Sequence, residues 1–268
     1  MLAALVATQL LGSMLAVLMV VVSGEPMPGT TALLWAAAAG TSGLVGLGSL
    51  FLALSRGIMG LVAPLTAVIA AAVPAIIGIA TGDRLDVPQM LGMLLALAAV
   101  VAVAFPSGDT VVGGSPMPRS RRIAEWGLVL LAGLGFAGFF LGVDRAHQLG
   151  AGPWWTLATS RTTSLCCIAL LSVVLLALRR APSLSGTRAV LPLLVVSAFG
   201  DTGGNLFFVL SRSETTLAIS VVLSSLYPVS TVILARLFLH ERLSRAALVG
   251  VVLAVCGVVL IGIGSTTG

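Results

Sequence analysis

The chain lacks most of what a soluble protein needs at its surface. It contains no lysine, and only 9% of its 268 residues are charged, whereas soluble domains carry about 25%. Hydrophobic residues make up 58% of the chain, and the mean hydropathy is +1.15. The chain has too few polar residues to shield its apolar residues from water, which excludes a soluble globular domain. The composition indicates a protein embedded in a lipid bilayer.

Basic charge is present only as arginine. Fourteen arginines outnumber nine acidic residues and give a pI near 10.4. Basic chains can bind nucleic acid, but here the arginines lie mostly in short links between apolar stretches. That placement is typical of residues that anchor and orient membrane helices. We therefore expect the lipid bilayer as a partner and no nucleic acid.

Residues for metal binding and covalent catalysis are also scarce. Three cysteines, Cys166, Cys167 and Cys256, lie within apolar stretches, and the two histidines have no ligand partner at metal spacing. The sequence has no nucleophile elbow, Walker loop, dinucleotide fingerprint or HExxH motif. It therefore predicts no enzyme activity, no cofactor and no metal site.

Nine apolar segments are long enough to cross a membrane, which takes roughly 20 residues per helix. The first has no positively charged start and is too long for a signal peptide, so we expect a retained helix. The period-two alternation of barrel strands is absent. The predicted fold is an all-α membrane bundle with helices at Leu2–Val22, Thr31–Leu54, Gly57–Ala80, Pro88–Phe105, Ala124–Ala146, Pro153–Leu178, Ala189–Leu210, Thr215–Phe238 and Arg245–Ile263.

The chain also contains a repeat. Three anchors recur in the same order, and each helix of the first half lies five helices before its counterpart. Because five is odd, corresponding helices cross the membrane in opposite directions, as in inverted-repeat transporters. We expect a first repeat at 1–109, a linker at 110–122 and a second repeat at 123–268. The anchor pairs are Gly29–Ala32 with Gly186–Ala189, Phe51–Arg56 with Phe207–Arg212, and Asp83–Leu85 with Glu241–Leu243.

The two halves are unequal, because the fifth predicted helix, Ala124–Ala146, has no counterpart in the first half. The first repeat is therefore expected to lack its opening helix. Two explanations stay open: the true start of the protein lies upstream, or the protein has nine spans.

Orientation follows from the arginines in the links, because cytoplasmic links carry the excess of positive charge. Ten arginines lie on one side, and three, Arg84, Arg145 and Arg212, lie on the other. This count predicts that the N-terminus is inside and the C-terminus outside.

Polar groups inside a bilayer are costly and are candidates for function. Arg161 lies about 12 Å from the start of its helix, and Asp201 about 15 Å from the end of the next helix, on the same side of the membrane. The two are therefore able to meet. Asn205 follows Asp201 by one turn on the same helical face. These residues either line a substrate cavity or form a buried structural pair, and Arg161 has the further option of snorkelling to the surface.

Three prolines lie more than one turn from either end of a predicted helix. Pro228 follows Tyr227 midway along Thr215–Phe238, and Pro64 and Pro74 lie in Gly57–Ala80. Proline removes a backbone donor and bends a helix, which either serves gating of a cavity or is tolerated for packing.

The stretch from Ser224 to Leu243, with its mid-helix Pro228 and with Glu241 thirteen residues on, followed by Gly250 and Gly257, resembles the closing helices of the EamA family. That family belongs to the drug/metabolite transporter superfamily. The resemblance implies ten helices in two inverted repeats, and export or uptake of small metabolites by alternating access. It carries over only the Pro228 and Glu241 positions. It also implies a cytoplasmic C-terminus, opposite to the arginine count.

The sequence thus predicts a secondary transporter in the cell membrane that moves a small metabolite or drug. Its cavity is expected to be lined by Asp201, Asn205, Tyr227 and Arg161, with Pro228, Pro64 and Pro74 as gating candidates. A homodimer is left open as its assembly. The alternative is a non-transporting membrane scaffold or an inactive transporter fragment.

Overall fold

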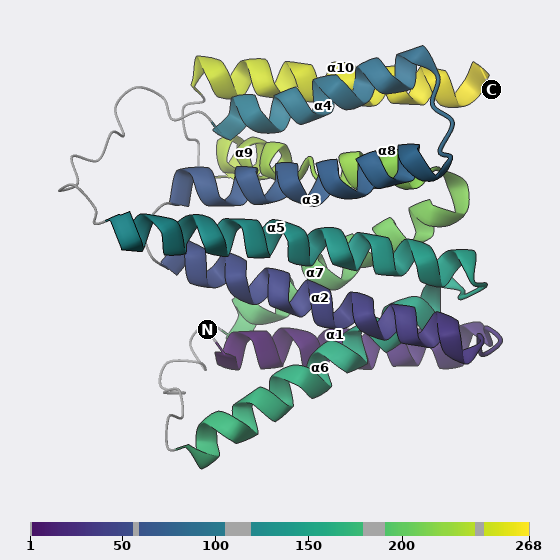
Figure 1. Cartoon of the computed structure of the whole chain (residues 1–268), viewed down its shortest axis with the longest axis vertical. Coiled ribbons are helices and arrows are strands. Elements are labelled where there is room, and N and C mark those ends of the chain that lie inside the picture. The colour runs from purple at the N-terminus through teal and green to yellow at the C-terminus, as the bar shows by residue number, and fades with distance from the viewer. Residues whose placement is uncertain (1, 56–58, 105–118, 179–190, 239–243, 268) are drawn as a thin grey trace. The chain divides into compact units, whose positions relative to one another are not determined.

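The chain folds into the helices that Figure 1 labels α1 to α10. The computed structural model describes residues 2–55, 59–104, 119–178, 191–238 and 244–267. No strand occurs in these ranges, which confirms the predicted all-α class. The helices are α1 (Leu2–Ser23), α2 (Thr30–Ser55), α3 (Met59–Thr81), α4 (Val87–Ala104), α5 (Arg119–Gln148), α6 (Pro153–Ala177), α7 (Leu191–Glu214), α8 (Leu217–Ser224), α9 (Tyr227–Phe238) and α10 (Arg245–Thr267).

One predicted helix is divided in two. The segment expected at Thr215–Phe238 forms α8 and α9, which are separated by Ser225 and Leu226. Pro228 has no N–H to donate to the carbonyl of Ser224, and its ring crowds that carbonyl, which favours a bend or a break at this point. The Leu226 N–H instead bonds back only to Leu223 O, at 3.2 Å. In contrast, α3 continues as one helix through Pro64 and Pro74.

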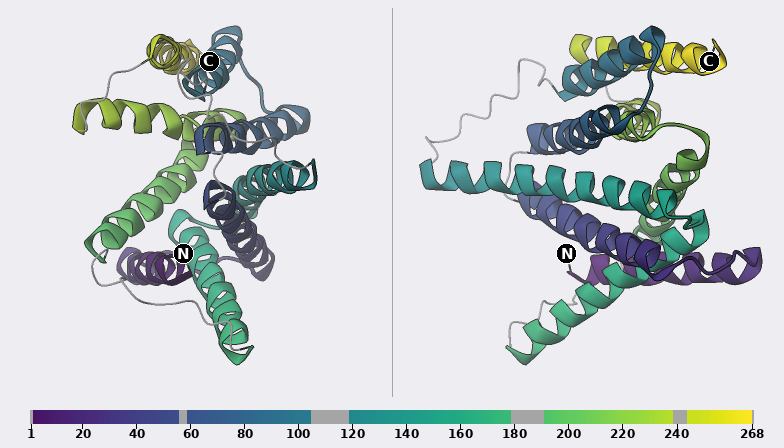
Figure 2. Two further views of the ribbon diagram at one scale, coloured as in Figure 1. Left: turned by 90° about the vertical axis from the view of Figure 1, so that its left-hand side faces the viewer. Right: turned by 45° about the vertical axis from the view of Figure 1, so that its right-hand side comes forward.

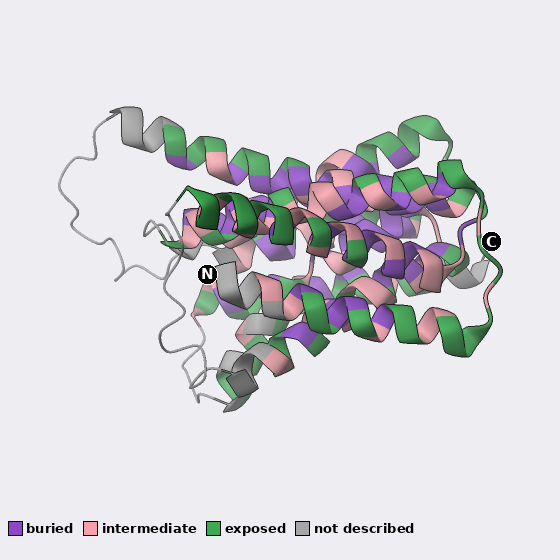
Figure 3. Ribbon diagram, turned by 90° about the horizontal axis from the view of Figure 1, so that it is seen from below, coloured by how far each residue is buried: buried purple, intermediate pink, exposed green. Residues whose placement is uncertain are grey.

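Six helical stretches are long and apolar enough to cross a membrane: Thr30–Ser55, Val62–Thr81, Ala124–Gln148, Pro153–Ala177, Leu217–Leu234 and Arg245–Gly264. Two further apolar stretches, Thr8–Ser23 and Val87–Val103, are shorter within the described residues. The remaining long helix, α7, carries three charged residues, Asp201, Arg212 and Glu214. Exposed residues occur along many of these helices (Figure 3). They include many large apolar residues, as expected for surfaces that face lipid.

The chain forms two compact units. Unit 1 contains residues 1–44 and 138–214, and unit 2 contains residues 45–137 and 215–268. In unit 1, α1 packs along α6 and α7. In unit 2, α4 packs along α10, which Figures 1 and 2 both show, and α3 packs against α8. Each unit therefore joins helices from both halves of the sequence.

Close packing of α4 and α10 depends on glycine. A Cβ added to Gly92 would lie 2.6 Å from the carbonyl oxygen of Gly257, and one added to Gly257 would lie 2.8 Å from that of Gly92. Both distances are too short for a methyl group beside a carbonyl. The two backbones therefore approach closely, as is common where small residues face each other in membranes.

Candidate substrate site

The centre of unit 1 holds an ion pair between α6 and α7. The Arg161 Nη1 lies 2.5 Å from Asp201 Oδ2, and Nη2 donates to the Asp201 backbone carbonyl at 2.9 Å. The Arg161 side chain is 4% exposed, whereas that of Asp201 is 36% exposed. The contact that the depths along the two helices allow is therefore present. Arg161 is buried, so it does not snorkel to the surface.

Helix α1 supplies a further hydrogen-bond partner for Arg161. Gln9, which is 4% exposed, accepts a hydrogen bond from Arg161 Nη1 at 2.9 Å. Arg161 is thus held by side chains from two other helices, which fixes the guanidinium in one orientation. Among the described residues, its Nε has no hydrogen-bond partner.

Two hydroxyl groups border the pair. The position of a Cβ on Gly12 lies 2.5 Å from Thr202 Oγ1 and 3.7 Å from Arg161 Cδ, so the backbone of α1 presses against both residues. Within the described part of the chain, Thr202 Oγ1 and Ser13 Oγ are buried and have no hydrogen-bond partner. Buried polar groups are nearly always paired in folded proteins. The region between α1, α6 and α7 therefore offers hydrogen-bonding capacity that the described residues leave unused.

The other predicted cavity residues lie in different places. Asn205 is half-buried on α7, one turn beyond Asp201 in unit 1. Tyr227 belongs to unit 2, where its hydroxyl donates to the carbonyl of Ala63 on α3 at 3.0 Å. Pro228 is buried at the start of α9, and Pro64 and Pro74 are buried in α3. Glu241 lies outside the described residues.

A second buried ion pair in unit 1 was missed by sequence reasoning. Arg212 on α7 donates to Asp144 Oδ1 on α5, from Nε at 3.0 Å and from Nη2 at 2.5 Å. Gln148 Nε2 donates to the other carboxylate oxygen at 2.9 Å. The sequence pattern placed Arg212 in a link, but α7 continues to Glu214 and the arginine is only 9% exposed. The available signal was Asp144, an acidic residue inside a predicted span.

Metal ligands are not grouped here. Within the described ranges, no cluster of three or more His, Cys, Asp or Glu side chains could hold a metal ion. The chemistry that the site does offer is a paired positive and negative charge with neighbouring hydroxyl and amide groups, inside helices that lie in lipid. Such an arrangement can bind and orient a polar ligand.

The family model of the EamA-like transporter family matches residues 123–263, more than half of the chain. The chain belongs to the EamA-like transporter family. The matched region runs from α5 through α10, so it includes the Arg161–Asp201 pair and the α8–α9 break. The resemblance found at Ser224–Leu243 is therefore confirmed, and this EamA-like protein is a multi-pass membrane protein of the drug/metabolite transporter type.

Solved structures support the same fold for this EamA-like chain. Sixteen chains match, and one of them, a crystal structure of a protein, shares 17% sequence identity. That structure superposes with a TM-score of 0.71 and covers 98% of this chain and 88% of its own. At this identity the likeness establishes the fold alone. Comparison with curated proteins gave no significant match.

Proposed function

We propose that this chain is a secondary transporter that moves a small metabolite or drug across the cell membrane by alternating access. Membership of a transporter family supports the general activity. The sequence predicts two inverted repeats, 1–109 and 123–268, around a linker at 110–122. This prediction supports the mechanism, because such repeats exchange roles when a site opens to one side and then the other.

The observation that carries this proposal is the Arg161–Asp201 pair. Asp201 lies ten residues from the start of α7 and thirteen from its end, so it is at least about 15 Å from either end of the helix. Charge at this depth is costly and is usually found where a substrate or ion passes. The arginine is buried and the aspartate is the more exposed partner. Asp201 is therefore the group that we expect to contact substrate, while Arg161 holds it in place.

We propose Asn205 in unit 1 and Tyr227 in unit 2 as further residues that contact substrate, each within its own unit. Asn205 shares the face of α7 that carries Asp201, because residues four apart are neighbours on a helix. Tyr227 supplies a ring and a hydroxyl at the α8–α9 break. We propose the prolines, and Pro228 above all, as gating residues.

Transport by purified protein in proteoliposomes tests the activity. Panels of amino acids, sugars and cationic drugs are offered in both directions, and we expect movement of at least one class. Asp201→Asn should abolish that movement while expression and membrane insertion stay intact. The matched control is Asp86→Asn, which removes an exposed carboxylate from the α3–α4 turn. If the wild type moves no member of any panel, the scaffold or inactive-fragment alternative is favoured.

Alternating access has its own test. In a variant lacking Cys166, Cys167 and Cys256, Asn205→Cys is treated with a membrane-impermeant thiol reagent from each side. We expect labelling from both sides, with a ratio that shifts when the transported substrate is added. Labelling from one side only, with no effect of substrate, would contradict the mechanism. A C-terminal reporter fusion in the same cells decides between the two orientations.

A further inference from the structure

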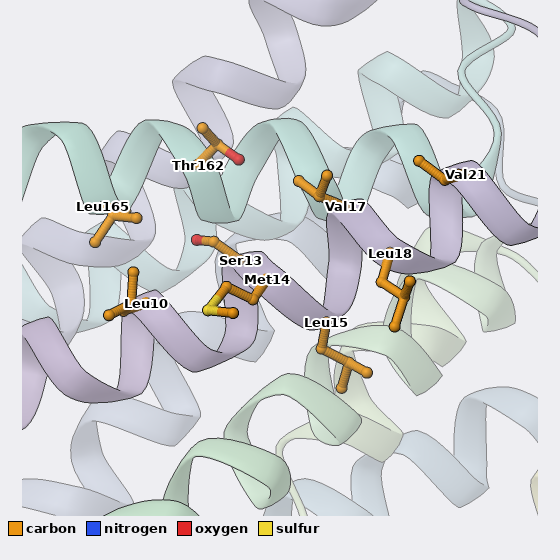
Figure 4. A pocket seen from close by; sticks show the side chains of 9 residues that line it. All are labelled: Leu10, Ser13, Met14, Leu15, Val17, Leu18, Val21, Thr162 and Leu165. Atoms are coloured by element: carbon orange, nitrogen blue, oxygen red, sulfur yellow. The ribbon is translucent and has the colours of Figure 1, made fainter.

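A groove of about 740 Å³ runs along unit 1 between α1 and α6 (Figure 4). Seven of its nine lining side chains are aliphatic or methionine, and several from α1 are well exposed, with Met14 at 63%. Because α6 is long and apolar enough to span a membrane, the molecules that reach this groove come from the bilayer. The lining residues are Leu10, Ser13, Met14, Leu15, Val17, Leu18, Val21, Thr162 and Leu165.

The wall of this apolar groove contains one unusual hydroxyl. Ser13 is 5% exposed, and its Oγ has no hydrogen-bond partner among the described residues. On α6, by contrast, Ser160 and Ser172 donate to carbonyls of their own helix at 3.0 and 2.7 Å, as serine usually does in a helix. Figure 4 shows the Ser13 hydroxyl directed into the space between α1 and α6. An unpaired buried hydroxyl favours a ligand that can bond to it.

The depth of Ser13 argues against a phospholipid as that ligand. Ser13 lies ten residues before the end of α1 and eleven after its start, so it is about 15 Å from either end of the helix. The head groups and ester groups of phospholipids lie at the edges of a hydrocarbon core about 30 Å thick. Only an acyl chain reaches this depth. It can fill the groove but cannot bond to the hydroxyl.

The groove also borders the candidate site. Gln9, Gly12 and Ser13 lie on one face of α1, because residues three and four apart are neighbours on a helix. Gln9 bonds to Arg161, and Gly12 presses against Thr202 and Arg161. A ligand bonded to Ser13 therefore lies directly beside the residues that hold Asp201.

We propose that this groove is a binding site for an uncharged lipophilic small molecule that carries one hydrogen-bonding group, such as a medium-chain alcohol. Its apolar body lies along Met14 and Leu165, and its polar group bonds to Ser13 Oγ. The ligand is uncharged because no charged side chain lines the groove and charge is costly in hydrocarbon. Binding here does not require the proposed transport activity.

Photolabelling of the full chain in lipid nanodiscs tests this site. The probes are an octanol and an octane that both carry a diazirine, and a phosphatidylcholine that carries a diazirine in one acyl chain. We expect the octanol to label peptides of α1 and α6 saturably. Ser13→Ala should raise the octanol concentration needed for half-maximal labelling about fivefold, which is the change in affinity expected for the loss of one hydrogen bond. Met14→Trp should abolish labelling by filling the groove.

Ser172→Ala is the matched control, because that hydroxyl already donates to Ile168 O and lies outside the groove lining. It should leave octanol labelling unchanged. Thermal unfolding of each variant establishes that the fold is kept, and Met14→Trp provides a steric test that does not depend on Ser13. Two outcomes overturn the proposal. One is equal labelling by octane and octanol with no effect of Ser13→Ala. The other is labelling by the phospholipid that octanol cannot displace.

Discussion

Glu25 and Trp155 bond to each other twice across 130 residues of sequence. The Trp155 backbone N–H donates to the Glu25 carboxylate at 2.9 Å, and its indole Nε1 donates to the Glu25 carbonyl at 3.0 Å. Helix α6 has no side-chain cap of its own at Gly152. The carboxylate from the α1–α2 turn therefore caps α6, where the helix dipole favours negative charge.

Unit 2 also contains a helix that is capped by an acidic residue from a distant turn. Asp83 accepts a hydrogen bond from Ala218 N at 2.9 Å, and so caps α8, whose own N-cap residue Thr216 makes no side-chain cap bond. In both units the acidic residue follows a glycine in the left-handed region, Gly24 with φ of 62° and Gly82 with φ of 119°. The glycine turns the chain sharply after α1 or α3 and so directs the next residue at another helix.

The first prediction concerns the Glu25 cap. Glu25→Ala should lower the stability of the protein by about 1–2 kcal/mol, because the α6 N–H loses its partner. Glu25→Gln should cost less, since its amide oxygen still accepts the bond. Thermal unfolding in detergent measures both, and Glu214→Ala, which removes an exposed carboxylate, is the control.

Gly152→Ala tests the same contact by a change at the start of α6 and not at Glu25. Its Cβ would lie 2.0 Å from a Glu25 carboxylate oxygen, although its backbone φ of −74° suits any residue. We expect a loss comparable to that of Glu25→Ala, and little further loss when both changes are combined. If the stability losses of the two single variants add fully, the Glu25 carboxylate does not stabilise the protein through its contact at Gly152.

The second prediction concerns the Asp144–Arg212 pair. Removal of one residue leaves the other buried charge without its ion-pair partner, so Asp144→Leu or Arg212→Met should each destabilise the protein by about 3–5 kcal/mol. The combination Asp144→Leu with Arg212→Met should cost much less, because no buried charge remains. Chemical unfolding in detergent measures this cycle, and Arg145→Gln, at an exposed neighbour, is the control. Simple addition of the single effects would mean that the two residues are energetically independent.

The helices of this protein could be predicted from the sequence, but several of its polar contacts could not. The predicted span Pro153–Leu178 forms α6 at Pro153–Ala177, because the apolar stretch must match the bilayer thickness. Arg161 and Asp201 could be paired because depth along two consecutive antiparallel helices is simple arithmetic.

The remaining contacts leave no local pattern in the sequence. From the sequence alone, Glu25 is expected to be a solvent-exposed residue in a turn, because its partner Trp155 is 130 residues away. Arg212 lies two residues beyond the predicted end of its helix, where arginine normally faces water. The unpaired hydroxyl of Ser13 depends on a rotamer, which sequence does not determine. The α8–α9 break was signalled by Pro228, but α3 contains two prolines and remains one helix, because neighbouring structure decides whether a helix with proline bends or breaks.

The third prediction concerns the closest approach of α4 and α10. Gly257→Ala should destabilise unit 2 by about 1–3 kcal/mol, because its methyl group would collide with the Gly92 carbonyl and push the helices apart. Gly262→Ala on the same helix is the matched control, since in the described part of the chain no atom outside the adjoining backbone of α10 lies within 4 Å of the added Cβ. It should be neutral or slightly stabilising through helix propensity. Thermal unfolding of the two variants compares them directly, and equal effects would refute the steric account.

The fourth prediction separates gating from stability at Pro228. Pro228→Ala restores an N–H that can donate to the Ser224 carbonyl, so α8 and α9 should join into one continuous helix. A continuous helix is more stable but cannot bend at this point. We therefore expect an unchanged or higher unfolding temperature together with transport slowed at least tenfold in proteoliposomes. Pro88→Ala, in the first turn of α4 where proline is tolerated, is the control and should leave the transport rate within about twofold of wild type. Transport at the wild-type rate in Pro228→Ala would show that the break serves packing alone, whereas loss of the folded protein would show that α8 and α9 need the break in order to pack at all.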